Sequence, residues 1–132
     1  MKEKGIVITA EDKISLQEFD RPLHRSLGKA VGGYIEVVHP VGIKHPFLMV
    51  VNEDGLRLEL PLNAIGSVLY GTLAHGHPIV GDIVIMKEGW TEDGPDVVGL
   101  TDKEAKDFLN LFSGLLKTVP SERRGENDPQ PQ

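Results

Sequence analysis

Histidines are the first residues in this sequence that could support chemistry, because imidazole is the commonest protein ligand for metal ions. There are five of them: His24, His39, His45, His75 and His77. His75 and His77 are two residues apart and would share a face in an extended segment. A zinc site, however, needs three or four converging ligands, and the sequence has no cysteine and no HExxH pattern. We therefore expect no metal and no other cofactor.

Hydrolytic and acid–base chemistry have little more support. Ser67 follows a single glycine and lacks the flanking glycines of a nucleophile elbow. Acidic pairs such as Glu53–Asp54 lie in predicted turns, where solvated carboxylates are the simpler interpretation. Asp82 precedes an apolar run, a position that suits either a turn cap at a strand entrance or a ligand contact at a sheet edge. Without a recognisable nucleophile, base and orienting group, we expect no enzyme.

Three other side chains could bind a small anionic ligand. In the segment LRLEL the leucines share one face of a predicted strand, so Arg57 points from the other, toward solvent or toward an anion in a groove. Trp90 lies in the predicted loop KEGWTEDGPD, and Tyr34 opens a predicted strand on which it should be partly buried. Either ring could stack on a ligand base. Arg57, Trp90, Tyr34 and Asp82 are therefore our candidate ligand-binding residues.

The composition restricts the partners and the compartment. The formal net charge of −6 argues against general nucleic-acid binding, which requires a basic face. No apolar run approaches the roughly 18 residues of a membrane span, and the N-terminal segment lacks the features of a signal peptide. Because there is no cysteine for a disulfide, we expect a cytoplasmic protein that does not bind membranes.

In the first half of the chain, β-rich runs at 5–10 and 14–19 predict a hairpin. Asp20 should cap a helix over 21–32, which would end at Gly32 in the left-handed conformation that costs glycine least. Gly33 would then allow a tight entry into a strand over 34–39, or a close approach by another group. The turn NEDG is expected to join FLMVV and LRLEL as a second hairpin.

In the second half, Asn63 should cap a short helix in AIGSVLYGTLA, and HPIVGDIVIM is apolar on both faces, as in a central strand covered on both sides. The segment TDKE predicts a capping box for a final helix. The apolar stripe of that helix should contain Phe108, Leu111, Phe112, Leu115 and Leu116.

These elements predict an α+β fold with an antiparallel or mixed sheet of about six strands and two or three covering helices. A single domain should span residues 1–117. Residues 118–132 have almost nothing to bury and are expected to form a disordered polar tail.

Four segments, VGGYIEVV, VVNEDG, LPLNAIGSVLYG and IVGDIVIM, occur in this order. On them the chain resembles domain of unknown function family 3846 over roughly residues 5–112. Its members are small proteins common in bacteriophages, plasmids and other mobile elements. The resemblance implies that context and implies no catalytic residues. The chain departs from the family pattern in the longer loop HPVGIKHP, the insertion AHGHP and the polar tail.

The resemblance and the candidate residues favour a non-catalytic accessory binding protein of a phage or mobile element, acting in the host cytoplasm. More specifically, such a protein would sequester a small anionic nucleotide-type signal of host defence. The alternative is a protein-interaction module that inhibits or adapts a host protein complex. Exposed hairpin edges on a small domain also predict a homo-oligomer.

Overall fold

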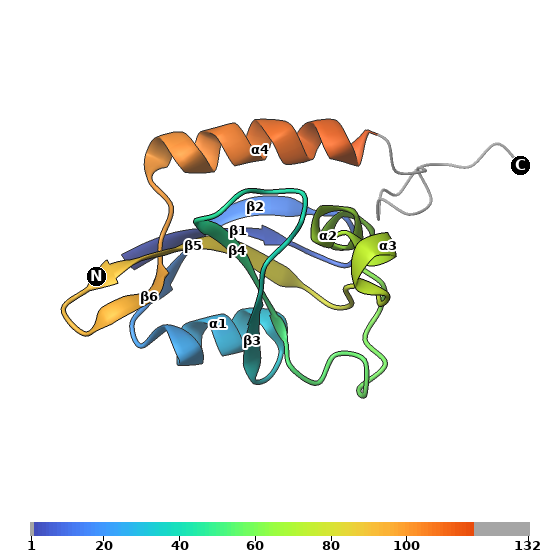
Figure 1. The fold of residues 1–132 in the computed structure, drawn as a ribbon, viewed down its shortest axis with the longest axis horizontal. Coiled ribbons are helices and arrows are strands. Elements are labelled where there is room, and N and C mark those ends of the chain that lie inside the picture. Colours follow the sequence, from blue (N-terminus) through green and yellow to red (C-terminus); the bar gives the residue numbers. More distant parts are fainter. Residues whose placement is uncertain (1, 118–132) are drawn as a thin grey trace, which may run out of the picture.

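A computed structural model describes residues 2–117 and contains one six-stranded antiparallel sheet with helices on both faces (Figure 1). The fold is therefore α+β, as predicted. The strands are β1 (Lys2–Ile8), β2 (Ile14–Asp20), β3 (Ile35–Val38), β4 (Phe47–Asn52), β5 (Ile83–Thr91) and β6 (Gly94–Val98). The helices are α1 (Leu23–Val31), α2 (Ala64–Tyr70), α3 (Thr72–His75) and α4 (Asp102–Leu116).

Strand β5 is the centre of the sheet. The order is β2-β1-β5-β4-β3, and β6 also pairs with β5. The first half of β5 pairs with β1, with Ile83 opposite Ile8, and its second half pairs with β6, with Lys87 opposite Val98. Because β5 is nine residues long, it can hold two successive partners along one edge while β4 occupies the other. The predicted β1–β2 hairpin is confirmed.

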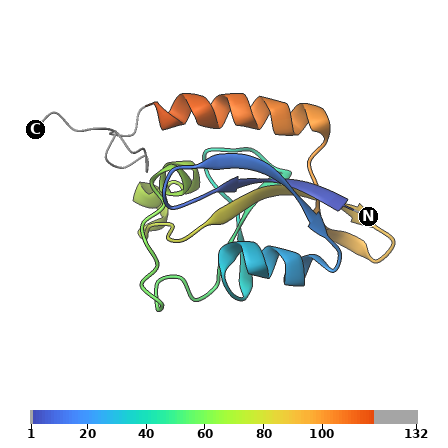
Figure 2. The same cartoon turned by 180° about the vertical axis from the view of Figure 1, so that it is seen from behind.

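Alternation along β5 divides the core in two. Ile83 and Ile85 point to one face of the sheet, whereas Val84 and Met86 point to the other. Helices α2 and α4 cover the first face and α1 covers the second (Figure 2). All four side chains are fully buried. This confirms the prediction of a strand covered on both faces, and each such side chain contributes roughly 1.5–3 kcal/mol of burial free energy.

Helix α1 ends at a left-handed glycine, as predicted. Gly32 has φ 84° and caps α1, and its N–H donates to the carbonyl of Gly28 at 2.8 Å. A Cβ on Gly33 would lie 2.9 Å from Nδ2 of Asn52, so this glycine permits a close approach. That Nδ2 donates to the carbonyl of Val31 at 3.1 Å, which gives a helix-end carbonyl a buried partner.

The start of α1 differs from the prediction. Asp20 is the last residue of β2, and the N-cap is Pro22, which makes no side-chain cap hydrogen bond. The backbone of Asp20 has a different role, because its carbonyl accepts from the hydroxyl of Ser26 at 2.7 Å. The predicted acidic cap is therefore wrong.

The second predicted hairpin is also wrong. Strand β4 pairs with β3 on one edge and β5 on the other, so no edge remains for LRLEL. The Oδ1 of Asn52 accepts from the N–H of Asp54 at 2.8 Å and starts a series of turns in place of a second strand. Leu56 and Leu58 are consequently half exposed, although alternation had assigned them to a buried face.

Two helix starts agree with the sequence. Asn63 is fully buried and caps α2 by accepting from the N–H of Gly66 at 2.8 Å. Thr101 and Glu104 form the predicted capping box of α4. In the predicted stripe of α4, Phe108 and Phe112 are buried, but Leu111 is 48% exposed and does not belong to the core.

The segment KEGWTEDGPD is not a loop. It forms the second half of β5 and the turn into β6, with Trp90 opposite Pro95. No helix within residues 2–117 has the length and apolar character needed to cross a membrane. The predicted tail, residues 118–132, lies outside the described residues.

Candidate functional site

A groove of about 640 Å³ runs between α1 and the start of β3. The apolar spacing of α1 creates it, because Leu23, Leu27 and Val31 turn toward the sheet and leave the opposite side of the helix outside. The groove is lined by His24, Arg25, Gly28 and Lys29 of α1 and by Gly32, Gly33, Tyr34, Ile35 and Glu53.

Two cations of this groove, Arg25 and Lys29, have a charge that is available to a ligand. Arg25 and Lys29 are four residues apart in one helix, so they are neighbours on its surface. Neither makes an ion pair within residues 2–117. Among the other lysines and arginines of residues 2–117, six make an ion pair (Lys2, Lys4, Arg21, Arg57, Lys87 and Lys103) and four do not (Lys13, Lys44, Lys106 and Lys117). What distinguishes Arg25 and Lys29 is that they are adjacent and line one groove.

Tyr34 supplies an aromatic wall to the same groove. It is 78% exposed, whereas the sequence predicted partial burial for it as the first residue of a strand over 34–39. The residue lies one position before β3, directly after the Gly32–Gly33 turn, and its side chain is not among those packed on either core. Its carbonyl accepts from the N–H of Glu53 at 2.8 Å, which fixes the backbone next to the groove. The ring is therefore positioned by the sheet and open to solvent.

The other three candidates lie elsewhere. Arg57 belongs to the turns after β4 and pairs with Asp54 at 3.4 Å. Asp82 accepts from the N–H of Ala10 at 2.9 Å, in the turn between β1 and β2. Trp90 is 83% exposed on the β5–β6 hairpin. The structure thus separates the candidates, and a role in ligand binding stays a prediction for each of these three.

A second pocket, of about 380 Å³, lies on the opposite face of the β3 edge. Glu36, Glu53 and Arg57 line it together with the buried Tyr70, whose hydroxyl is 3.1 Å from Nε2 of His77. Burial raises the pKa of the Tyr70 hydroxyl, and the nearby Glu36 carboxylate raises it further. Tyr70 is therefore neutral at physiological pH and acts in this pocket as a hydrogen-bonding group, not as an anion.

Comparison with protein-family models identifies the family of this chain. The family model described as Domain of unknown function (DUF3846) matches residues 1–113. The chain belongs to this family. The match confirms the resemblance drawn from the four sequence segments and covers all six strands of the sheet. No curated protein and no solved structure matched the chain.

Two histidines of this DUF3846 domain contact one tyrosine. The ring of His75 stacks on Tyr70 with centroids 3.9 Å apart, and His77 lies on the same tyrosine at 5.2 Å. Among residues 2–117, no group of three or more histidine, aspartate or glutamate side chains could hold a metal ion.

Arg25 and Lys29, which line the groove beside α1, are not among the residues predicted from the sequence. Charged residues are usual on the solvent-facing side of an amphipathic helix, so an arginine and a lysine there do not by themselves indicate a binding site. The available clue was their spacing of four residues, directly before the Gly32–Gly33–Tyr34 turn that brings an aromatic ring alongside them.

Proposed function

We propose that this protein is a non-catalytic binding protein that holds a small anionic ligand of the nucleotide class in the groove beside α1. The observation that carries the proposal is the pair of cations without carboxylate partners within residues 2–117, Arg25 and Lys29, on one face of α1. In a chain with a net charge of −6, such a spot attracts an anion locally while the rest of the surface repels it.

The groove offers a complementary partner to each part of a nucleotide. The planar guanidinium of Arg25 would pair with phosphate bidentately, and Lys29 would add a second charge-assisted hydrogen bond. Tyr34, which is exposed, would stack on the base. Glu53, which also lines the groove, would accept hydrogen bonds from sugar hydroxyl groups.

The biological role we propose is sequestration. The mobile-element context implied by the family resemblance makes a nucleotide-type signal of host defence the natural ligand. Binding without turnover would lower the free concentration of such a signal. Sequestration of this kind requires only a site with available positive charge and an aromatic ring for stacking.

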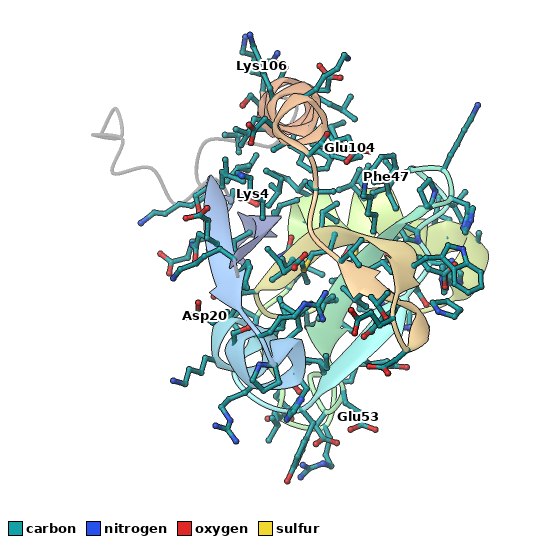
Figure 3. The ribbon with its side chains drawn as sticks, turned by 90° about the vertical axis from the view of Figure 1, so that its left-hand side faces the viewer. Lys4, Asp20, Phe47, Glu53, Glu104 and Lys106 are labelled. Carbon is teal, nitrogen blue, oxygen red and sulfur yellow. The ribbon has the colours of Figure 1, made fainter. Side chains whose placement is uncertain are left out.

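Isothermal titration calorimetry tests the proposal, with cyclic nucleotides and NAD-derived cyclic nucleotides as probes. Arg25→Ala and Lys29→Ala should each weaken binding by about tenfold or more, the scale of one charge-assisted hydrogen bond. Tyr34→Ala should weaken it as well. The matched control is Lys106→Ala, because this exposed cation lies on α4, far from Glu53 and the groove (Figure 3).

Two results would contradict the proposal. One is the absence of heat with every probe, together with no nucleotide-like absorbance released on denaturing the purified protein. The other is an equal loss of affinity in Lys106→Ala, which would mean that the probes respond only to overall charge.

A second function, the protein-interaction module, is favoured by a different observation. Val41, Val68 and Leu73 are exposed by 66%, 65% and 102% on or beside α2 and α3. Apolar side chains exposed in one region commonly belong to a contact surface. A protein that purifies without ligand but retains a host protein through this region would support the module over ligand capture.

A further inference from the structure

Strand β3 ends the sheet and has one unoccupied edge within residues 2–117. The carbonyl of Tyr34 accepts from the N–H of Glu53, and pairing with β4 continues with Glu36 opposite Val51. In an antiparallel pair the main-chain groups of alternate residues face the partner strand. Those of Tyr34 and Glu36 face β4, so those of Ile35 and Val37 face outward, as a template for another strand.

The face of β3 that carries Glu36 is acidic. Glu36 and Glu53 both line the pocket of about 380 Å³, and neither carboxylate makes an ion pair within residues 2–117. The arginine of this pocket, Arg57, pairs with Asp54 at 3.4 Å and so does not neutralise the other two acids. This side of the edge therefore has negative charge available for a cation.

The opposite face of the same edge is apolar. Ile35 packs against the core beneath α1, and Val37, two residues further along, is 36% exposed. A strand added outside β3 would place one side chain next to Glu36 on the acidic face. The residues before and after it would lie next to Ile35 and Val37 on the apolar face, because side chains alternate along a strand.

We propose that the free edge of β3 binds an extended segment of a partner protein by strand addition, with the pattern apolar–basic–apolar. The lysine or arginine of that segment pairs with Glu36 and reaches toward Glu53, and its apolar neighbours cover Val37 and Ile35. Main-chain hydrogen bonds from Ile35 and Val37 supply affinity, and the acidic pocket supplies specificity. Pairing with Glu36 uses the face opposite the groove beside α1, and the proposal does not depend on nucleotide capture. Ile35 and Glu53 line that groove as well, so the peptide is tested without nucleotide.

Charge decides between a basic segment and a second copy of this chain. Antiparallel pairing of β3 with β3 of another copy follows a two-fold axis perpendicular to the sheet, which keeps equivalent faces on the same side. That arrangement brings two acidic pockets side by side, and like charges next to one another across strands are destabilising. A basic segment meets the same surface with complementary charge.

Fluorescence anisotropy tests the proposal with the labelled peptide Thr-Val-Lys-Val-Thr and its counterpart Thr-Val-Glu-Val-Thr, without nucleotide present. The parent protein should bind the lysine peptide saturably and the glutamate peptide at least about tenfold more weakly. Glu36→Lys should reverse this preference. Glu18→Lys, an exposed position on the other edge strand β2, is the matched control and should leave the preference unchanged.

Val37→Pro tests the main-chain part of the proposal. Proline removes the N–H that faces outward and spares the hydrogen bonds to β4, which residues such as Glu36 make. Binding of the lysine peptide should be lost while the melting temperature remains close to that of the parent protein. If Val37→Pro fails to fold, the reversal of preference in Glu36→Lys remains the deciding measurement.

Two outcomes would overturn the inference. Equal binding of the two peptides by both the parent protein and Glu36→Lys would show that Glu36 does not select a basic side chain. Absence of peptide binding, together with a dimer that Val37→Pro converts to a monomer, would assign the edge to a second copy.

Discussion

Arg25 and Arg57 illustrate that residue type alone does not tell whether a charge is available to a ligand. Both are arginines on the outside of the molecule, and both line a pocket. Arg57 is three residues from Asp54 within one series of turns and pairs with it, whereas Arg25 has no ion-pair partner within residues 2–117. An exposed pair such as Arg57–Asp54 contributes little to stability, about 0–1 kcal/mol, yet it removes a charge from competition for ligand.

Gly32 leads to a prediction at the scale of one residue. Its φ of 84° lies in the left-handed region, which a β-branched side chain adopts only under strain. Gly32→Val should therefore reduce the free energy of unfolding by roughly 1–3 kcal/mol, measured by urea denaturation. Gly114→Val is the control, since Gly114 is helical and a Cβ there would meet nothing within 4 Å. An unchanged midpoint in Gly32→Val would mean that this backbone conformation carries no strain.

At the scale of elements, α4 is attached to the sheet by charge as well as by its apolar face. Lys87 of β5 donates to the Glu104 carboxylate of α4 at 2.9 Å, and the same oxygen accepts from the N–H of Thr101 at 2.8 Å. Figure 3 shows Glu104 at the lower side of α4, facing the sheet. Phe108 completes the attachment through an edge-on contact with Phe47, with ring centroids 4.7 Å apart.

This attachment predicts a dependence of stability on pH. Burial opposes ionisation of Glu104, but hydrogen bonds from Thr101 and Lys87 outweigh it and hold the pKa of the carboxyl below its usual value. A depressed pKa in the folded state means that the contribution is present above the unfolded pKa and is lost as pH falls through the folded pKa. Glu104→Gln should therefore cost about 1 kcal/mol at pH 7 and much less at acid pH.

Urea denaturation of Glu104→Gln and the parent protein at neutral and acid pH checks this prediction. Asp107→Asn is the matched control, because its partner Lys103 lies on the same exposed helix surface and the pair does not connect α4 to the sheet. A difference between Glu104→Gln and the parent protein that stayed constant with pH would contradict the electrostatic explanation.

At the scale of the whole molecule, both faces of the sheet are covered by helices (Figures 1 and 2). At the end with α2 and α3, however, apolar side chains remain exposed. Leu69 and Tyr70 of α2 are buried, whereas Val68 of the same helix and Leu73 of α3 are exposed. A helix of seven residues with few turns can direct only one side toward the core. The remaining apolar surface is available for association.

We predict that the protein self-associates through this end. Light scattering at low micromolar concentration should report a dimer or larger species, because burying Val41, Val68 and Leu73 removes apolar surface from water. The double variant Val68→Ser/Leu73→Ser should be monomeric. Leu111→Ser, at an exposed position of α4, should retain the parent's mass. A monomeric parent protein would contradict the prediction.

Local patterns in the sequence determined three helix ends and the central strand. The Thr101–Glu104 capping box, the Asn63 cap and the left-handed Gly32 each depend on residues within a few positions of one another, so the order of residue types is enough to predict them. The apolar run of β5 likewise predicted burial on both faces, because consecutive β-branched residues favour a strand that is covered on both sides.

Tertiary structure alone decided what the remaining segments became. LRLEL alternates like a strand, but β3 and β5 already occupy both edges of β4, so it folds into turns. The same pairing exposes Tyr34 beside Arg25 and Lys29, and within residues 2–117 it leaves the outer edge of β3 open. Strand pairing joins residues distant in the chain, and periodicity within one segment carries no information about it.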